Sequence, residues 1–544
     1  MFLRNWRCAL LPIVSVVGVA LAPVSPAAAA ALNWSPGTAA DHTNTYERGD
    51  QASFVFTATG FSSAQAPTLQ LRIVDAEERV IGQQQLSLTA QGDSWQARFT
   101  PQTQQTGFFR IYATAVGGSE SATLPAMGTM PAGYLTYVVV PSVSARPPLS
   151  EDNAFFGMQG GFSGNTTSLI PMLGIRWLLA SLRWDQTEPD HHQQLVEKFK
   201  ASAAGPSDLS RSIPFRQADW KTYPLPTLFF RRPAWAGSMD KSSFGKAWEE
   251  YCRNALSVYK ASAIELPKRI YQITWEPDLD PEFKNDASGV FDLYKAAYPV
   301  IHSLDPAAVV IGPTRSNIDA GSRDWNNQLI KQGLLQYLDG WAVHPYNRPD
   351  SALFMQQQLD QLRSDMQALG GKQVPIYATE HGRRTNPDAG DELKQARFMV
   401  ESNIVLLGEG APMAMSFYIH DGTGQSSSGF GIYYNLNTKI SFGTDRVAPK
   451  PVAGAYAAMT SLLEGGHPTG RLSPGAGLMG YQLTRGGGKI YVVWSAADEK
   501  PHAGRLSCEG SLNIYDWMGN KREQQYKCGS TQSFGPDPVY LTSD

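Results

Sequence analysis

The sequence predicts an α/β protein: a (β/α)8 TIM barrel with an immunoglobulin-like β-sandwich before it and a small β-domain after it. Residues 32–140 alternate short strand-like runs with turn residues, residues 151–464 alternate apolar runs with stretches of helical period, and residues 465–544 return to short strands. Of the 544 residues, 42% are hydrophobic and 17% are charged. That is enough length and apolar material for two or three separate cores.

Residues 1–31 are typical of a signal peptide. Arg4 and Arg7 precede an apolar run over 9–21, and the alanine-rich stretch 23–31 suits a signal peptidase site. The apolar run is shorter than the ~20 residues that a membrane-spanning helix needs. We therefore expect an exported protein, periplasmic or secreted, that is not inserted in the membrane after cleavage.

The N-terminal domain, residues 32–140, is predicted from strand-like runs separated by Gly, Ser and Pro. These runs cover 52–57, 69–74, 95–99 and 108–113. Short strands that follow one another without a helical period are typical of an immunoglobulin-like sandwich. We expect a structural spacer, with carbohydrate binding as the alternative. The stretch 141–150, rich in Pro, Ser and Arg, predicts a linker.

The barrel, residues 151–464, is predicted because strand-like runs are separated by stretches of helical period, as in a parallel sheet with crossover helices. The strands are expected at 155–159, 177–182, 226–230, 271–275, 309–312, 340–344, 376–379 and 413–418. Helical patterns between and after them include 244–260, 326–338, 392–407 and 453–463. The third connection crosses the polar stretch 202–220 and has the weakest pattern.

Residues 465–544 predict a small β-domain packed on the barrel, with strands that include 489–494, 512–515 and 539–542. Cys508 and Cys528 lie in this region, near enough in sequence to close a loop in an oxidising compartment. We expect them to form a disulfide. Cys252 falls within a helical pattern of apolar residues and is expected to be a small buried hydrophobe.

The charge balance restricts the partners. The formal net charge is −3 and the chain has no long basic run, so we expect neither nucleic acid nor an anionic membrane surface as a partner. The cysteines lack the spacing of a zinc site, and we expect neither a cofactor nor a metal. The balance fits a polysaccharide or oligosaccharide substrate, and we expect a monomer.

Two glutamates carry the main chemical prediction. Glu276 follows the apolar run 271–275, and Glu380 follows the run 375–379. Side chains at the C-terminal ends of barrel strands line the active site. Two carboxylates there can hydrolyse a glycosidic bond, one by protonating the leaving oxygen and the other by attacking the anomeric carbon, about 5 Å apart for retention. The sequence therefore predicts a retaining glycoside hydrolase.

Other polar and aromatic residues are expected at the same strand ends. Sugars present apolar CH faces that stack on aromatic rings, and hydroxyls that need charged or amide partners. The candidate substrate-binding residues are Arg183, Trp184, Trp275, His344, Tyr346, Tyr418 and His420. Tyr346 is also expected to donate a hydrogen bond that keeps the nucleophile ionised.

The pattern resembles clan A of the glycoside hydrolases, whose acid/base ends strand four and whose nucleophile ends strand seven. The resemblance implies that Glu276 is the acid/base and Glu380 the nucleophile. Within the clan, the segment 182–189, the strand-six motif 344–346 and the C-terminal β-domain are most similar to the family 39 group of β-xylosidases, α-L-iduronidases and bacterial exopolysaccharide-processing hydrolases. The chain departs from the clan at Trp275, where an asparagine usually contacts the sugar 2-hydroxyl.

Alternatives remain open for several residues. Glu276 could pair with Arg183, and Glu380 could cap the helix that follows it. His344 could belong to the barrel wall, and the tryptophans could be core. The pair Arg231 and Arg232 could form a solvated rim, or it could face the cleft and favour an acidic sugar.

Alternatives also remain for the reaction and for a metal. Trp275 motivates an inactive barrel that only binds glycan, and a third possibility is transglycosylation at the same site. Asp278 and Asp280 could bind calcium, although solvated loop charges explain them better.

Overall fold

The computed structural model describes residues 29–38, 42–61, 66–147, 154–162, 164–188, 216–217, 220–261, 269–281, 283–346, 350–422, 429–437 and 446–543. The predicted signal peptide lies outside these residues except for its last three positions, and the first strand, β1, begins at Ala31. Most of the predicted third barrel connection, 202–220, also lies outside them, with only 216–217 and 220 described. No helix of the described part of the chain is both long and apolar enough to cross a membrane.

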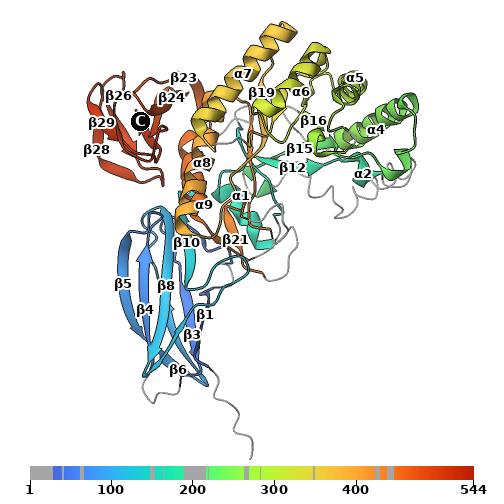
Figure 1. Ribbon diagram of the computed structural model, residues 1–544. Coiled ribbons are helices and arrows are strands. Elements are labelled where there is room, and N and C mark those ends of the chain that lie inside the picture. The colour runs from blue at the N-terminus through green and yellow to red at the C-terminus, as the bar shows by residue number, and fades with distance from the viewer. Residues whose placement is uncertain are drawn as a thin grey trace, which may run out of the picture.

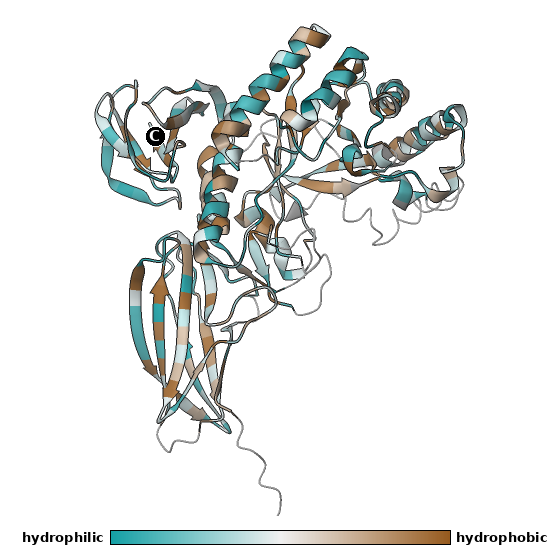
Figure 2. Ribbon diagram, in the orientation of Figure 1, coloured by the Kyte–Doolittle hydropathy of each residue, from teal (hydrophilic) through white to brown (hydrophobic). Residues whose placement is uncertain are grey.

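The N-terminal region is a sandwich of two β-sheets, as predicted (Figure 1). One sheet has the strand order β1-β3-β7-β6, and the other has the order β2-β10-β8-β4-β5 with β9 paired to β8. Buried positions alternate along β3 because successive strand side chains point to opposite faces. The same alternation shows as brown and teal bands along β4 (Figure 2). The strands are β1 (Ala31–Pro36), β2 (Thr45–Glu47), β3 (Phe54–Thr59), β4 (Thr68–Val74), β5 (Val80–Ser87), β6 (Thr89–Gln91), β7 (Ser94–Phe99), β8 (Gly107–Gly117), β9 (Glu120–Thr123) and β10 (Tyr134–Val140).

The middle of the chain is a nearly closed parallel barrel, which confirms the predicted fold class. Its strand order is β17-β16-β15-β12-β11-β20-β19-β18, and an isolated parallel bridge from Ile311 to Gly340 joins the two ends of that order. The strands overlap all eight predicted runs. They are β11 (Phe156–Met158), β12 (Trp177–Ser181), β15 (Tyr223–Phe229), β16 (Ile270–Thr274), β17 (Val309–Ile311), β18 (Trp341–Val343), β19 (Ile376–His381) and β20 (Ala414–Ser416).

Helices follow the strands and pack outside the barrel (Figure 1). Four of them begin at a side-chain cap that accepts a hydrogen bond from an unpaired backbone N–H of the first turn: Asp286, Asp319, Ser351 and Asp388. The helix predicted at 326–338 instead begins after Asp319 and ends at Lys331, before Gly333 with its positive φ. The helices are α1 (Leu169–Met172), α2 (Trp184–Thr187), α4 (Lys241–Ala261), α5 (Ala287–Leu304), α6 (Ala320–Lys331), α7 (Ala352–Gly370), α8 (Ala389–Gly408) and α9 (Pro451–Leu463).

The barrel interior is packed with apolar side chains, so chemistry is restricted to its ends. Strand residues and their neighbours form an apolar cluster that is separate from the core beneath the helices. It contains Ala154, Trp177, Tyr223, Leu225, Ile270, Ile311, Ala342, Tyr377, Met413 and Met415. Cys252 is fully buried on α4, as expected for a small hydrophobe.

The C-terminal region is a β-domain, as predicted. Its main sheet has the order β23-β24-β25-β30-β27-β28, and β26 pairs with β29. Cys508 and Cys528 form the expected disulfide, with their Cα atoms 5.2 Å apart. The strands are β23 (His467–Arg471), β24 (Leu478–Arg485), β25 (Gly488–Ser495), β26 (His502–Arg505), β27 (Ser511–Tyr515), β28 (Lys521–Lys527), β29 (Thr531–Phe534) and β30 (Val539–Thr542).

The sandwich is joined to the barrel by apolar and ionic contacts. Phe108 of β8 and Val138 of β10 belong to the same buried cluster as Val452 of α9. Arg110 of β8 donates to Glu392 of α8 over 2.7 Å, and both side chains are almost fully buried. The two domains therefore share a buried interface.

Candidate active site

The two predicted catalytic glutamates both lie at C-terminal strand ends. Glu380 is the penultimate residue of β19, and its side chain is largely buried. Glu276 follows β16 by two residues and has a left-handed backbone, with φ 45° and ψ 55°. A non-glycine residue in this conformation costs of order 1–3 kcal/mol, and such residues cluster at active sites. The turn directs the Glu276 side chain toward the neighbouring strand ends.

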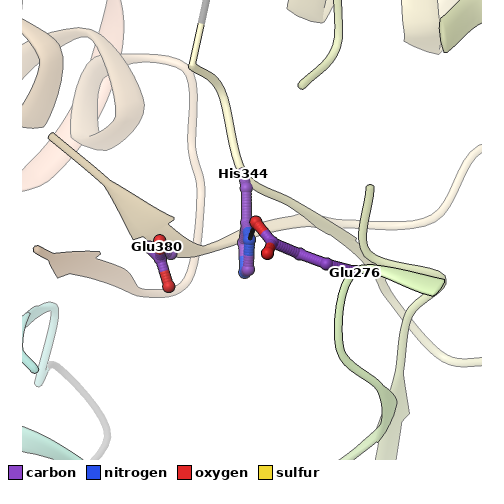
Figure 3. A group of neighbouring side chains, drawn as sticks. All are labelled: Glu276, His344 and Glu380. Carbon is purple, nitrogen blue, oxygen red and sulfur yellow. Dashed lines mark hydrogen bonds and ion pairs between the residues drawn. The ribbon is translucent and has the colours of Figure 1, made fainter. Parts of the chain in front are cut away.

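Glu276, His344 and Glu380 come together although they lie far apart in sequence. One carboxylate oxygen of each glutamate and a ring nitrogen of His344 lie within 4.8 Å of one another. The Nδ1 atom of His344 is 2.8 Å from Oε1 of Glu276. Figure 3 shows these two side chains pointing toward each other from the ends of different strands. The two carboxylates are thus close enough to act on one bond.

Glu380 is held by two hydrogen-bond donors. The Tyr346 hydroxyl donates to Oε1 over 2.8 Å, and Nε2 of Gln159 donates to Oε2 over 3.1 Å. Burial raises the pKa of Glu380 above its ordinary value, and nearby Glu276 acts in the same direction. His344, Tyr346 and Gln159 oppose this rise without cancelling it.

Gln159 is a site residue that the sequence reasoning missed. It follows β11 directly, is 4% exposed, and its Nε2 also donates to the backbone oxygen of Thr379. The signal was present, because the first predicted strand ends at this residue. The strand-end rule that selected Glu276 and Glu380 would have selected Gln159 too.

His344 and Trp275 form one side of the site. The His344 ring is fully buried, and the half-buried indole of Trp275 meets it edge to face at 4.6 Å between centroids. In the described residues, Nε2 of His344 has no hydrogen-bond partner. Trp275 therefore places an aromatic edge beside the acid/base candidate, where the clan usually has an amide.

His381 supports the strand that carries Glu380. It is fully buried, with its two ring nitrogens 3.1 Å and 3.4 Å from the hydroxyls of Ser402 and Ser416. Burial lowers the pKa of His381 to about 4, so the ring stays neutral over most of the pH range. These contacts tie the end of β19 to α8 and β20.

Two predicted substrate-binding residues at the end of β12 have other contacts. The Trp184 indole is completely buried between Trp235, Trp248 and Tyr251 and donates to Glu188. This corrects the prediction for Trp184, because aromatic packing has enclosed a residue that was expected to face sugar. Arg183 donates through Nε and Nη2 to Asp185 and does not pair with Glu276.

The predicted residues after β20 line the end of the eighth strand. Tyr418 is half-buried, and its ring lies 5.8 Å from that of His420. His420 is fully buried, with Nδ1 3.2 Å from the backbone oxygen of Asp421. Burial lowers the pKa of His420. Its ring is therefore enclosed by the barrel wall, and direct substrate contact remains a prediction only for Tyr418.

Acidic side chains in and near the site could in principle hold a metal ion. Asp278 accepts hydrogen bonds from the backbone and hydroxyl of Ser316, which fits a structural role. The oxygens of Glu276 and Glu380 and the ring nitrogen of His344 are atoms of the kind that bind transition metals. That the site works without metal remains a prediction.

Known proteins show only a distant likeness. No protein-family model and no curated protein sequence matches the chain. A glucosidase from Croceicoccus marinus is 11% identical, covers 73% of this chain and 97% of its own, and has a TM-score of 0.47. BuGH86 in complex with neoagarooctaose is 11% identical, covers 72% and 75%, and has a TM-score of 0.46.

A third solved structure is longer than this chain. Bacteroides uniformis beta-glucuronidase 2, covalently bound to cyclophellitol-6-carboxylate aziridine, is 11% identical, with a TM-score of 0.36. The match covers 94% of this chain and 59% of the glucuronidase.

Proposed function

We propose that this protein is a retaining glycoside hydrolase that cleaves a polysaccharide or oligosaccharide with Glu380 as nucleophile and Glu276 as acid/base. One observation carries the proposal: oxygens of the two glutamates, from the ends of the fourth and seventh strands, lie within 4.8 Å of each other. Retaining enzymes hold their carboxyl groups about 5 Å apart, whereas inverting enzymes leave room for a water between them.

The hydrogen bonds support this division of roles. Glu380 accepts from both Tyr346 and Gln159, and donors favour the ionised form of a carboxyl group. The described contacts of Glu276 include only one hydrogen bond, to a histidine nitrogen that can accept a proton from it. This difference in hydrogen bonding supports Glu380 as the nucleophile and Glu276 as the acid/base.

The reaction follows in two steps. Glu380 attacks the anomeric carbon and forms a glycosyl ester while Glu276 gives its proton to the leaving oxygen. Glu276, now ionised, takes a proton from water, and the resulting nucleophile attacks the same carbon and releases Glu380. The configuration at the anomeric carbon is inverted twice and so retained.

The test combines conservative variants with product stereochemistry. We expect Glu380→Gln and Glu276→Gln to lose hydrolysis of a glycan panel while their thermal unfolding is unchanged. Glu250→Gln, on an exposed position of α4, is the matched control and should keep full activity. NMR of the first product should show the anomer of the substrate. Full activity in both site variants, or an inverted first product, would refute the mechanism.

A glycan-binding protein without catalysis is the second candidate, and Trp275 favours it. If the protein only binds glycan, calorimetry should show binding to a glycan that the protein does not cleave. Transglycosylation at the same glutamates is a third candidate, and products longer than the substrate would identify it.

We also propose that the chain belongs to clan A and is nearest to family 39, on the motifs of strands two, four, six and seven.

Export is the proposed localisation. The basic and apolar pattern of residues 1–31 supports it, and so does a disulfide between Cys508 and Cys528, which needs an oxidising compartment. N-terminal sequencing of protein recovered from the periplasm or medium should begin near residue 32. A mature protein that keeps residues 1–31 and stays in the cytoplasm would refute the proposal.

A further inference from the structure

Arginines follow several strands at the end of the barrel that holds the glutamates, which we call the barrel mouth. Among the described residues, carboxylates close to this mouth already have partners. Asp185 is paired with Arg183, and Asp421 is paired with Lys450. Asp278 lies 3.6 Å from a guanidinium nitrogen of Arg315. Within the described ranges, these pairs leave little negative charge free around the catalytic glutamates.

Two exposed arginines of the barrel mouth lack such partners. In the part of the chain that the structure describes, Arg231 and Arg384 are exposed and make no ion pair or hydrogen bond. Arg231 follows β15 and Arg384 follows β19, four strands apart in the barrel order. Strands four apart in an eight-stranded barrel stand on opposite sides, so the two arginines flank the mouth.

Both arginines lie near a catalytic glutamate. Arg231 is level with Glu276, which follows the neighbouring strand, and Arg384 is near Glu380 in sequence. Phe229 is paired with Thr274, and the Trp275 N–H donates to the Phe229 oxygen over 3.2 Å. Arg231 and Glu276 each follow this pair by two residues. Arg384 follows Glu380 by four residues. A glycan bound across the glutamates would therefore extend toward an arginine on each side.

An aromatic ring accompanies the cation at the end of β15. The guanidinium carbons of Arg183 and Arg231 lie 4.0 Å and 5.2 Å from the centroid of the half-buried Phe230 ring. A partly exposed ring beside cations offers an apolar surface for the CH groups of a sugar and charge for its substituents.

We infer that the barrel mouth binds a glycan that carries carboxylates, such as a polyuronate, with Arg231 and Arg384 contacting sugars on opposite sides of the cleaved bond. The inference rests on the proposed function and names its substrate class. A guanidinium matches a carboxylate with two parallel hydrogen bonds. The protein as a whole has a formal net charge of −3, so a positive mouth is a local feature and not a result of overall charge.

Binding is measured by calorimetry with the Glu380→Gln variant, which cannot turn over. The probes are oligomers of galacturonate, mannuronate and glucuronate, each beside the same oligomer with its carboxyl groups reduced to alcohols. At least one uronate should bind about a hundredfold more tightly than its reduced form, since each of the two arginine contacts to a carboxylate should contribute about tenfold. The preference should weaken at high salt.

Matched variants locate the contact. Arg231→Gln and Arg384→Gln should each lower the affinity for the uronate about tenfold and leave the affinity for its reduced form unchanged. Arg522→Gln, on an exposed position of β28, is the control and should change neither. Equal affinity for both forms, binding of dextran sulfate but of no uronate, or unchanged uronate affinity in the double arginine variant would overturn the inference.

Hydrolysis by the wild type separates this inference from the proposed function. If the protein cleaves neutral glycans and shows no preference for uronates, the inference fails and the glycosidase assignment stands. If it binds uronates through the two arginines but releases no product, the inference stands and the glycosidase assignment fails.

Discussion

Glu380 is a buried carboxyl group whose ionised form is disfavoured by burial and favoured by hydrogen bonds. Burial raises its pKa, while the donors Tyr346 and Gln159 favour the ionised form. A nucleophile in this setting is poorly solvated, so it is available to attack carbon once it has lost its proton. The same setting makes its ionisation sensitive to each donor.

Removing one donor should change the pH dependence of activity. In Tyr346→Phe the charged form of Glu380 loses a hydrogen bond, so its pKa rises further. Activity needs ionised Glu380, and the acidic limb of the kcat/KM profile should therefore move to higher pH. We expect kcat/KM near neutral pH to fall about ten- to hundredfold, the equivalent of one hydrogen bond to a charged group.

The control for this prediction is Tyr515→Phe, a half-buried tyrosine of β27, which should leave the profile unchanged. Gln159→Met should shift the acidic limb in the same direction as Tyr346→Phe, since it removes the second donor. An acidic limb that stays in place in both site variants would show that Glu380 does not govern it.

Single residues were predicted well where a strand end alone determines their position. Glu276, Glu380, His344 and Tyr346 were all expected at strand ends, and the structure brings them together. Trp184 was expected there on the same ground but is enclosed by rings from α4 and the β15 loop. A side chain at a strand end can face either the site or the core. The choice depends on packing partners that lie elsewhere in the chain.

At the scale of elements, a disulfide joins the two ends of the β27–β28 hairpin in the C-terminal sheet. Cys508 precedes β27 and Cys528 follows β28, and the two are 20 residues apart. Strands β27 and β28 form the outer edge of the main sheet. Closing this loop restricts the unfolded chain more than the folded one, which stabilises the hairpin.

Removing the disulfide should lower stability without changing chemistry. We expect the Cys508→Ala/Cys528→Ala variant to lose about 3 kcal/mol of unfolding free energy, as chain entropy predicts for a loop of this length. Urea unfolding measures the loss, and kcat/KM should be retained because the identified site residues belong to the barrel. As a control, reductant should lower the urea midpoint of the wild type to that of the variant and leave the variant's midpoint unchanged. A variant as stable as the oxidised wild type would contradict the prediction.

At the scale of the whole molecule, a buried charge network joins the sandwich to the barrel. Arg110 of the sandwich contacts Glu392 of α8 and also pairs with Glu78. Tyr434 of the short strand β21 (Tyr433–Asn435) donates to the same glutamate. The sandwich thus supplies the cation that pairs with the buried Glu392 of the barrel, which makes it an integral part of the fold and more than a spacer.

Breaking this network on one side should destabilise the protein strongly. Arg110→Met leaves Glu392 buried without its cation, which costs about 3–5 kcal/mol. The double variant Arg110→Met/Glu392→Leu should lose less than the two single variants added together, since it no longer leaves Glu392 buried without its cation. The free energies come from urea unfolding, with the exposed Arg522→Gln as control. Strictly additive losses would show that the two groups are not coupled.

The sequence by itself determined the order of domains, the barrel strands and the two glutamates, because these depend on local periodicity and on the rule that strand ends form the active site. Only the tertiary structure decided which strand-end side chains converge. It brought Gln159 to Glu380, paired Arg183 with Asp185 and enclosed Trp184. These outcomes depend on loop conformations and on contacts between residues distant in sequence, which local patterns do not encode.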